Sequence, residues 1–229
     1  MDETFDGLVR QVRRRIELER GFGIAFEPGG PASAEGDEKM PQTGDRAEQL
    51  AALEQEMSGC QACPLGTTRT NLVFGAGDAA ARLVFVGEAP GEEEDRQGIP
   101  FVGRAGQLLD KIIVNGMKMR REDVYICNIL KCRPPGNRNP TASEMFHCQP
   151  FLERQLAIIR PTVICALGAI AAHALLNTDE PIGRLRGKWH DWRGIPMMVT
   201  YHPAYLLRTP SGKAKVWSDV KQVMARLAE

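Results

Sequence analysis

From residue 82 onward, short apolar runs alternate with segments that repeat apolar residues at helical spacing. The apolar runs have few polar interruptions, which is typical of strands buried on both faces of a sheet. The expected strands are Arg82–Val86, Val124–Ile129, Thr162–Leu167 and Met197–Tyr201. The expected helices are Ala105–Asn115, Ser143–Ile159, Ala169–Leu176 and Ala214–Leu227. This alternation predicts a three-layer α/β/α fold with a central, four-stranded, mainly parallel sheet.

The first 47 residues follow a different pattern. Residues 5–20 place apolar side chains near helical spacing among several arginines, which predicts a short amphipathic helix. Residues 21–45 are rich in Gly, Pro, Ala, Ser and acidic residues, as flexible linkers are. We therefore expect an N-terminal helical and disordered extension over residues 1–47 and one α/β domain over residues 48–229. A further helix is expected from near Asp45 to Gly59.

The formal net charge of the chain is zero, but the charge is unevenly distributed. Residues 1–59 carry 13 acids and 7 bases, whereas residues 60–229 carry 16 acids and 22 bases. A mildly basic main body is compatible with a polyanionic partner such as nucleic acid. No apolar run is long enough to span a bilayer, and the acidic N-terminus lacks the pattern of a signal peptide. We therefore expect a cytoplasmic protein without a membrane partner.

The loops that follow parallel strands meet at one edge of the sheet, where α/β proteins place ligands. The loop after the first expected strand, Gly87–Gly103, contains turn residues, a run of four acids and Phe101. Asn128 ends the second strand, and His202 follows the fourth. Each polar residue has an ordinary alternative role, since Glu88 could cap a helix, Asn128 could bond loop amides and His202 could stabilise a Pro turn. Their occurrence at three strand ends of one sheet predicts a binding site.

Four of the six cysteines form a candidate metal site. Cys60 and Cys63 make a Cys-x-x-Cys pair, and Cys132 and Cys148 lie after the second expected strand. Four thiolates suit either a tetrahedral zinc ion or a cubane iron–sulfur cluster. The alternative is that Cys132 and Cys148 are ordinary buried thiols. The other two cysteines lie inside expected strands, where they act as small apolar residues.

Three long motifs resemble those of the type 4 iron–sulfur uracil-DNA glycosylases. The first motif is Gly87-Glu88-Ala89-Pro90-Gly91-x-x-Glu94-Asp95, followed by Gly98-x-Pro100-Phe101-Val102-Gly103-x-Ala105-Gly106-x-Leu108-Leu109. The second motif is Asn128-Ile129-x-Lys131-Cys132-Arg133-Pro134-Pro135-x-Asn137-Arg138. The third motif is Tyr201-His202-Pro203-Ala204-Tyr205-Leu206-Leu207-Arg208. The resemblance covers roughly residues 48–228. It implies a monofunctional enzyme of base excision repair that hydrolyses the N-glycosidic bond of deoxyuridine in DNA, releases uracil and leaves an abasic site.

The resemblance also implies roles for individual residues. The implied substrate-binding residues are Gly87, Glu88, Ala89, Phe101, Asn128 and His202. The implied catalytic residues are Glu88, Glu94 and His202, and the implied ligands of a [4Fe-4S] cluster are Cys60, Cys63, Cys132 and Cys148. Other groups of the superfamily have Asp or Asn where this chain has Ala89, so the division of work between Glu88 and Glu94 stays open.

The resemblance also implies how the chain would engage DNA. Leu206 is the first and Leu207 the second candidate for a wedge that fills the gap left by a flipped base. Candidate phosphate contacts are Arg104, Lys131, Arg133, Arg138, Arg184, Arg186, Lys188 and Arg208.

The implied partner is uracil-containing single- or double-stranded DNA of the prokaryotic nucleoid. We expect a monomer whose N-terminal extension contacts another repair or replication protein. Two alternatives stay open. One is a glycosylase of broader range that removes hypoxanthine or mismatched bases. The other is a non-catalytic iron–sulfur or zinc module that binds DNA.

Overall fold

The computed structural model describes residues 43–229. The expected N-terminal helix and the expected linker up to residue 42 lie outside them, and residues 43–45, expected in the linker, begin a helix. A mixed six-stranded sheet forms the centre of the described part, in the order β1-β3-β2-β4-β6-β5. The four inner strands are parallel to one another. They are β2 (Leu83–Gly87), β3 (Tyr125–Asn128), β4 (Val163–Leu167) and β6 (Ile195–Thr200). The predicted α/β class and its parallel core are therefore confirmed.

The predicted number of strands is wrong, because two antiparallel edge strands join the four inner ones. They are β1 (Ala76–Gly77), which pairs with β3, and β5 (Trp189–Trp192), which pairs with β6. β1 is only two residues long, and three of the four residues of β5 keep contact with solvent. Neither segment therefore has the continuous apolar run that marks the inner strands in the sequence.

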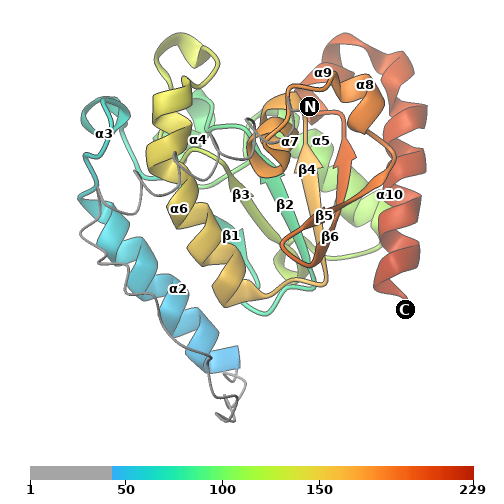
Figure 1. The fold of residues 1–229 in the computed structure, drawn as a ribbon, viewed down its shortest axis with the longest axis horizontal. Coiled ribbons are helices and arrows are strands. Elements are labelled where there is room, and N and C mark those ends of the chain that lie inside the picture. Colours follow the sequence, from blue (N-terminus) through green and yellow to red (C-terminus); the bar gives the residue numbers. More distant parts are fainter. Residues whose placement is uncertain (1–42) are drawn as a thin grey trace, which may run out of the picture. The chain divides into compact units, whose positions relative to one another are not determined.

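Helices cover both faces of the sheet and make the three layers visible in Figure 1. One apolar cluster joins a face of the sheet to α2 (Thr43–Ser58), α6 (Ala142–Ile159), α7 (Ala169–Leu176) and α8 (Ile182–Leu185). A second cluster joins the opposite face to α5 (Arg104–Asp110), η1 (Lys111–Met117), α9 (Pro203–Arg208) and α10 (Lys213–Leu227). The remaining short helices are α3 (Leu65–Thr68), α4 (Glu92–Gln97), η2 (Arg121–Asp123), η3 (Pro135–Asn137) and η4 (Pro210–Gly212).

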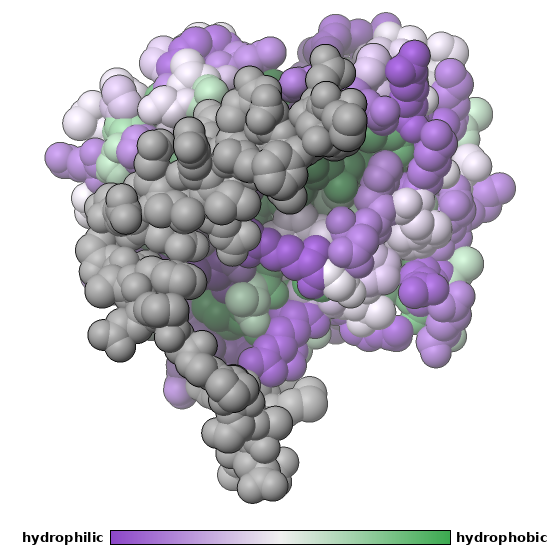
Figure 2. Space-filling model, in the orientation of Figure 1, coloured by the Kyte–Doolittle hydropathy of each residue, from purple (hydrophilic) through white to green (hydrophobic). Residues whose placement is uncertain are grey.

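The alternation of side chains along β2 explains why both faces must be covered. Val84 and Val86 belong to the first cluster, and Leu83 and Phe85 belong to the second. Since successive residues of a strand point to opposite faces, an unbroken apolar strand needs helices on both sides. The described surface on the side shown in Figure 2 is correspondingly mostly polar, with apolar residues in a few patches.

Most expected helices match the structure within two residues, but the one after Phe101 changes its character. The expected helix Ala105–Asn115 is an α-helix to Asp110 and a π-helix from Lys111 to Met117. α2 begins at Thr43, two residues before the expected start near Asp45. Within the described residues no helix has the length and apolar character needed to cross a membrane.

Candidate active site

The loops after β2 and β3 are joined at the carboxyl edge of the sheet. Gly87 pairs with Asn128 in the parallel ladder. Beyond it, the N–H of Ile129 donates to the Gly87 carbonyl at 2.9 Å, and the N–H of Leu130 donates to the Glu88 carbonyl at 3.0 Å. The two strand ends therefore continue side by side, and the residues predicted to act together are in one place.

Asn128 presents an unpaired hydrogen-bond acceptor in the interior. Its side chain is 2% exposed, and its Oδ1 has no hydrogen-bond partner in the described part of the protein. A Cβ atom at Gly87 would lie 2.4 Å from this Oδ1 and 2.6 Å from Cζ of Phe101, so only glycine fits between them. Because a buried polar atom without a partner is costly, the arrangement indicates a site for a ligand that donates a hydrogen bond.

Phe101 is held in an unusual backbone conformation. Its φ is +53°, in the left-handed region that bulky residues avoid. Two neighbours fix the segment. Arg121 donates a hydrogen bond to the Pro100 carbonyl at 2.6 Å. Gly106 lies so close to Phe101 that a Cβ atom on it would be 1.9 Å from the Phe101 carbonyl oxygen. The buried ring lies with its centroid 5.6 Å from that of His202. The structure thus brings Gly87, Phe101, Asn128 and His202 together.

Glu94 makes its hydrogen bonds with the loop backbone. Its Oε1 accepts the N–H groups of Val102 at 3.0 Å and Gly103 at 2.8 Å, and its Oε2 accepts the N–H of Gly91 at 3.1 Å. These contacts tie the start of α4 to the segment that follows Phe101. The carboxylate therefore shapes the wall of the site.

Glu88 has different surroundings from Glu94. It is half-buried at the end of β2, and burial raises the pKa of its carboxyl group. No side-chain hydrogen bond involves it within the described residues, so its carboxylate is available to a ligand or a water molecule. Ala89, the next residue, packs against the cluster of Leu65, Leu130 and Cys132.

His202 is a neutral hydrogen-bond donor in this structure. Its Nδ1 accepts the N–H of Ala204 at 3.2 Å, which leaves the ring proton on Nε2. Burial, with a smaller effect of the positive charge of Arg208, lowers the pKa of His202 to about 4, and the charge of Glu94 opposes this change. The imidazole is therefore uncharged at neutral pH and offers one N–H.

The two wedge candidates point to different environments. Leu206 is 2% exposed and belongs to the apolar cluster beneath α9 and α10, whereas Leu207 is 42% exposed. A wedge must leave the protein surface to reach DNA. The structure therefore favours Leu207, the second choice, for that role.

The four candidate metal ligands line one cavity. Cys60, Cys63, Cys132 and Cys148 surround it together with residues such as Met57 and Phe151. No group of three or more His, Cys, Asp and Glu side chains in the described part is arranged to hold a metal ion.

Two N–H groups support the sulfurs of this cavity. Arg69 donates to Sγ of Cys132 at 3.2 Å, and the N–H of Lys131 donates to Sγ of Cys148 at 3.3 Å. Burial raises the pKa of both thiols, that of Cys148 to about 11, so positive charge from a bound group is needed to hold them as thiolates. The other two cysteines are buried in the sheet, as expected.

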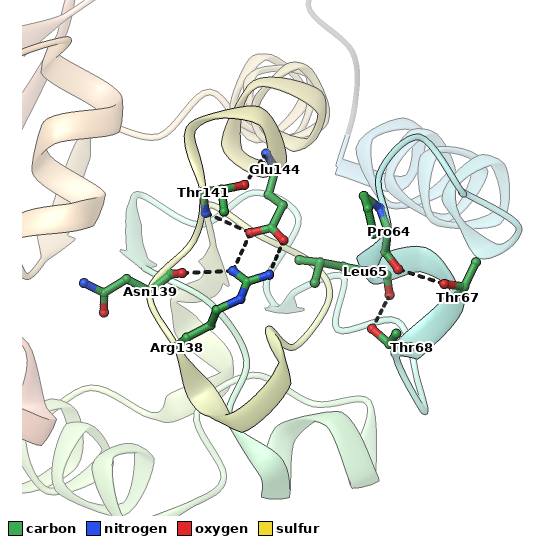
Figure 3. Close-up of polar contacts among 8 residues, drawn as sticks. All are labelled: Pro64, Leu65, Thr67, Thr68, Arg138, Asn139, Thr141 and Glu144. Carbon is green, nitrogen blue, oxygen red and sulfur yellow. Dashed lines mark hydrogen bonds and ion pairs between the residues drawn. The ribbon is translucent and has the colours of Figure 1, made fainter.

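The segments that carry the cavity thiols are fixed by local hydrogen bonds (Figure 3). Arg138 makes two hydrogen bonds with the Glu144 carboxylate, at 2.6 and 2.9 Å, and Thr141 caps the start of α6. After Cys63, the hydroxyl groups of Thr67 and Thr68 donate to the carbonyls of Pro64 and Leu65. Both sides of the cavity are thus rigid turns followed by helices.

The expectation of a phosphate contact is wrong for Lys131. Its side chain is 0% exposed, and its Nζ donates to the Asn128 carbonyl at 2.8 Å. Burial lowers the pKa of Lys131, and the thiol groups of Cys127 and Cys148 oppose the change. Arg138 and Arg186 are paired with Glu144 and Asp219, whereas Arg104, Arg184, Lys188 and Arg208 are exposed.

Arg69 and Arg121 are functional candidates that sequence reasoning missed. Arg69 contacts a cavity thiol, and Arg121 holds the segment of Phe101. Neither lies at a recognisable spacing from its partner, because the contacts join segments far apart in the chain.

Comparison with known proteins identifies the family of the chain. Residues 74–221 match the model of the uracil DNA glycosylase superfamily. The chain is 48% identical to a type-4 uracil-DNA glycosylase of Thermotoga maritima over 181 residues, which are 77% of this chain and 94% of that protein. It is 44% identical to the type-4 enzyme of Archaeoglobus fulgidus, covering 77% of this chain and 92% of that protein.

A type-5 uracil-DNA glycosylase of Pyrobaculum aerophilum is less similar. The identity is 32%, covering 57% of this chain and 64% of that protein. Since the type-4 relatives match over nearly their whole length and the superfamily model covers most of the α/β unit, the chain belongs to the type 4 family of the uracil-DNA glycosylase superfamily.

Proposed function

We propose that this protein is a uracil-DNA glycosylase, which hydrolyses the N-glycosidic bond of deoxyuridine in DNA and leaves an abasic site for repair. The observation that carries the proposal is the buried, unpaired Oδ1 of Asn128 next to Phe101 and His202. The type-4 relatives support it, because they are named for this activity.

Asn128 can read uracil through both atoms of its amide. Uracil offers an N3–H donor and an O4 acceptor, which complement the carbonyl oxygen and the NH₂ group of Asn128. Cytosine presents the opposite pattern there, so it would leave Oδ1 and its own groups unpaired, at a cost of about 1–3 kcal/mol per group. Gly87 leaves the space that this approach needs. The ring of Phe101 provides a surface for stacking of the base.

His202 and Glu88 are placed to stabilise the charges that develop as the bond breaks. The departing uracil gains negative charge, which the Nε2–H of neutral His202 can stabilise by a hydrogen bond to O2. The sugar gains positive charge, which the ionised carboxylate of Glu88 can offset while it orients the attacking water. Ala89 offers no polar group for this task, so Glu88 is the acid assigned to it.

Access to the bond requires that the nucleotide leave the DNA stack. An enzyme that acts on a base flips it into a pocket, at a cost of a few kcal/mol. Leu207, exposed on α9 five residues after His202, is assigned as the side chain that fills the vacated space. The exposed arginines near these loops would contact the phosphates.

We also propose that the thiol cavity holds a [4Fe-4S] cluster with Cys60, Cys63, Cys132 and Cys148 as ligands. The donor set fits, because four thiols line one cavity and two N–H groups donate to their sulfurs. A single zinc ion bound by the same four thiolates is the alternative, and the metal content of the purified chain distinguishes the two. When bound, the cluster would supply cross-links between the loop after α2, the loop after β3 and α6, since hydrolysis of this bond needs no electron transfer.

The remaining expectations belong to the same proposal. The protein would act as a monomer in the cytoplasm, and residues 1–47 would contact another repair or replication protein.

The deciding experiment uses the purified full chain and a DNA oligonucleotide with one uracil, followed by alkali treatment. We expect strand cleavage at the uracil and none in matched oligonucleotides with cytosine or thymine. Binding of the uracil oligonucleotide without alkali-sensitive sites would instead identify a non-catalytic DNA-binding module. Release of hypoxanthine or mismatched thymine at a similar rate would identify a glycosylase of broader range.

A further inference from the structure

Lys131 carries a buried amino group that the proposed mechanism does not use. It lies in the loop between β3 and η3, and its side chain is 0% exposed. A buried ammonium group is costly unless it is hydrogen-bonded. Its Nζ donates to the backbone carbonyl of Asn128 at 2.8 Å. The amino group is therefore hydrogen-bonded to the residue whose side-chain amide faces the proposed base site.

The contact with Lys131 completes the hydrogen bonding of one particular peptide group. The Asn128 carbonyl and the Ile129 N–H belong to the same planar unit. Lys131 holds the carbonyl, and the Gly87 carbonyl accepts the N–H at 2.9 Å. With both ends fixed, the peptide plane cannot rotate. The direction of the Asn128 side chain, which leaves the chain at the adjacent Cα, is restrained with it.

The backbone of Lys131 connects this point to the thiol cavity. Its N–H donates to Sγ of Cys148 at 3.3 Å, and its carbonyl accepts the N–H of Val73 at 2.9 Å. Lys131 is thus held on both sides of its own Cα. The amino group is consequently presented to Asn128 from a fixed position.

We propose that Lys131 is a positioning residue that holds the Asn128 amide in the orientation that reads the base and connects it to the thiol cavity. This inference rests on the proposed function. The bond to Cys148 uses the backbone N–H, which every residue except proline retains. A side-chain substitution therefore removes the contact with Asn128 and leaves the support of the thiol.

The test compares Lys131→Met, Asn128→Ala and the double variant. Methionine has a similar length, fills the same space and lacks the donor. We expect Lys131→Met to lower the single-turnover rate of uracil release at least tenfold, with unchanged bound metal and circular dichroism. In the Asn128→Ala background the same substitution should cost less than twofold, because the amide to be positioned is gone. Lys221→Met, at an exposed site on α10, is the matched control and should stay within twofold of wild type.

Three outcomes would overturn the inference. They are a Lys131→Met rate within twofold of wild type, an equal loss in both backgrounds, and a loss of bound metal or folded structure together with activity. Failure of the proposed function is recognised separately, since the wild-type chain would then release no uracil. In that case a crystal structure of Lys131→Met still tests the inference, because an unmoved Asn128 side chain would refute it.

Discussion

The Phe101 ring lies 5.6 Å from the imidazole of His202, with the two ring planes inclined by 35°. This contact joins the loop after β2 to the start of α9 after β6, although the two residues are far apart in sequence. Asn128 reaches the same place from β3, with only Gly87 between its Oδ1 and Phe101. A stacking surface, an amide and a neutral N–H donor are thus gathered at three strand ends of one sheet.

Asn128→Ala should remove uracil excision and leave the fold intact. The substitution deletes both hydrogen bonds to the base and also removes an unpaired buried atom, so stability should not suffer from lost contacts. We expect kcat/KM to fall roughly 100- to 1,000-fold, as two lost hydrogen bonds imply. Oligonucleotide cleavage gives the rate, and urea unfolding gives the stability. Near-normal excision would remove Asn128 from the base site.

Glu94→Gln should be far less harmful than Glu94→Ala. A glutamine oxygen can still accept the N–H groups of Val102 and Gly103, so only the bond with Gly91 is lost, whereas alanine loses all three. We expect kcat/KM to fall about fivefold for Glu94→Gln and more than tenfold for Glu94→Ala, at about 1 kcal/mol per hydrogen bond. Equal losses in both variants would show that the negative charge of Glu94 takes part in the chemistry.

Glu88 should set the acid side of the pH profile. Burial raises the pKa of its carboxyl group, and its proposed role needs the ionised form. Activity should therefore decline as the pH falls through a value above the ordinary 4.5. His202 adds no transition between pH 5 and 8, because its pKa of about 4 keeps it neutral there.

Glu88→Gln provides the control for this assignment. The rate should drop about 100-fold, as expected for loss of a positioned catalytic carboxylate, and the acid-side decline should disappear. Measurement of kcat from pH 5 to 8 for both proteins checks it, because His202 stays neutral over this range. A variant that kept the wild-type decline would assign the titration to another group.

Leu206→Ala and Leu207→Ala should separate stability from DNA distortion. Leu206 is buried, so its truncation should cost about 2–4 kcal/mol of unfolding free energy. Leu207 is 42% exposed, so its truncation should change stability by less than about 0.5 kcal/mol. Leu207→Ala should slow excision from duplex DNA more than from single strands. An equal effect on both substrates would argue against a wedge.

Cys63→Ser should remove the proposed cluster, whereas Cys165→Ala should not. Cys63 lines the thiol cavity, and Cys165 is buried within β4. We expect the wild-type chain and Cys165→Ala to absorb visible light and to contain about four irons per chain. Cys63→Ser should lose both properties and melt at a lower temperature. One zinc per chain and no visible absorption in the wild type would replace the cluster with a single-ion site.

The sequence by itself determined the class of fold and the place of the candidate site. Buried inner strands such as β2 need unbroken apolar runs, and such runs are readable in one dimension. Turn residues and polar side chains at the strand ends located the site for a related reason, because the carboxyl ends of parallel strands share one edge. The edge strands were not predictable, since their pairing depends on hydrogen bonds to a neighbour and not on their own composition.

Only the tertiary structure decided what several site residues do. Glu94 and Glu88 look equivalent in the sequence. Backbone N–H groups from two segments converge on the Glu94 carboxylate, whereas none from the described part of the chain donates to the Glu88 carboxylate. Leu206 and Leu207 are neighbours that differ only in the face of α9 on which they lie. Lys131, in a polar loop, would be expected in solvent, but packing between β3 and the thiol cavity buries it. Direction, burial and pairing of a side chain are set by segments distant in the chain, and residue type alone does not encode them.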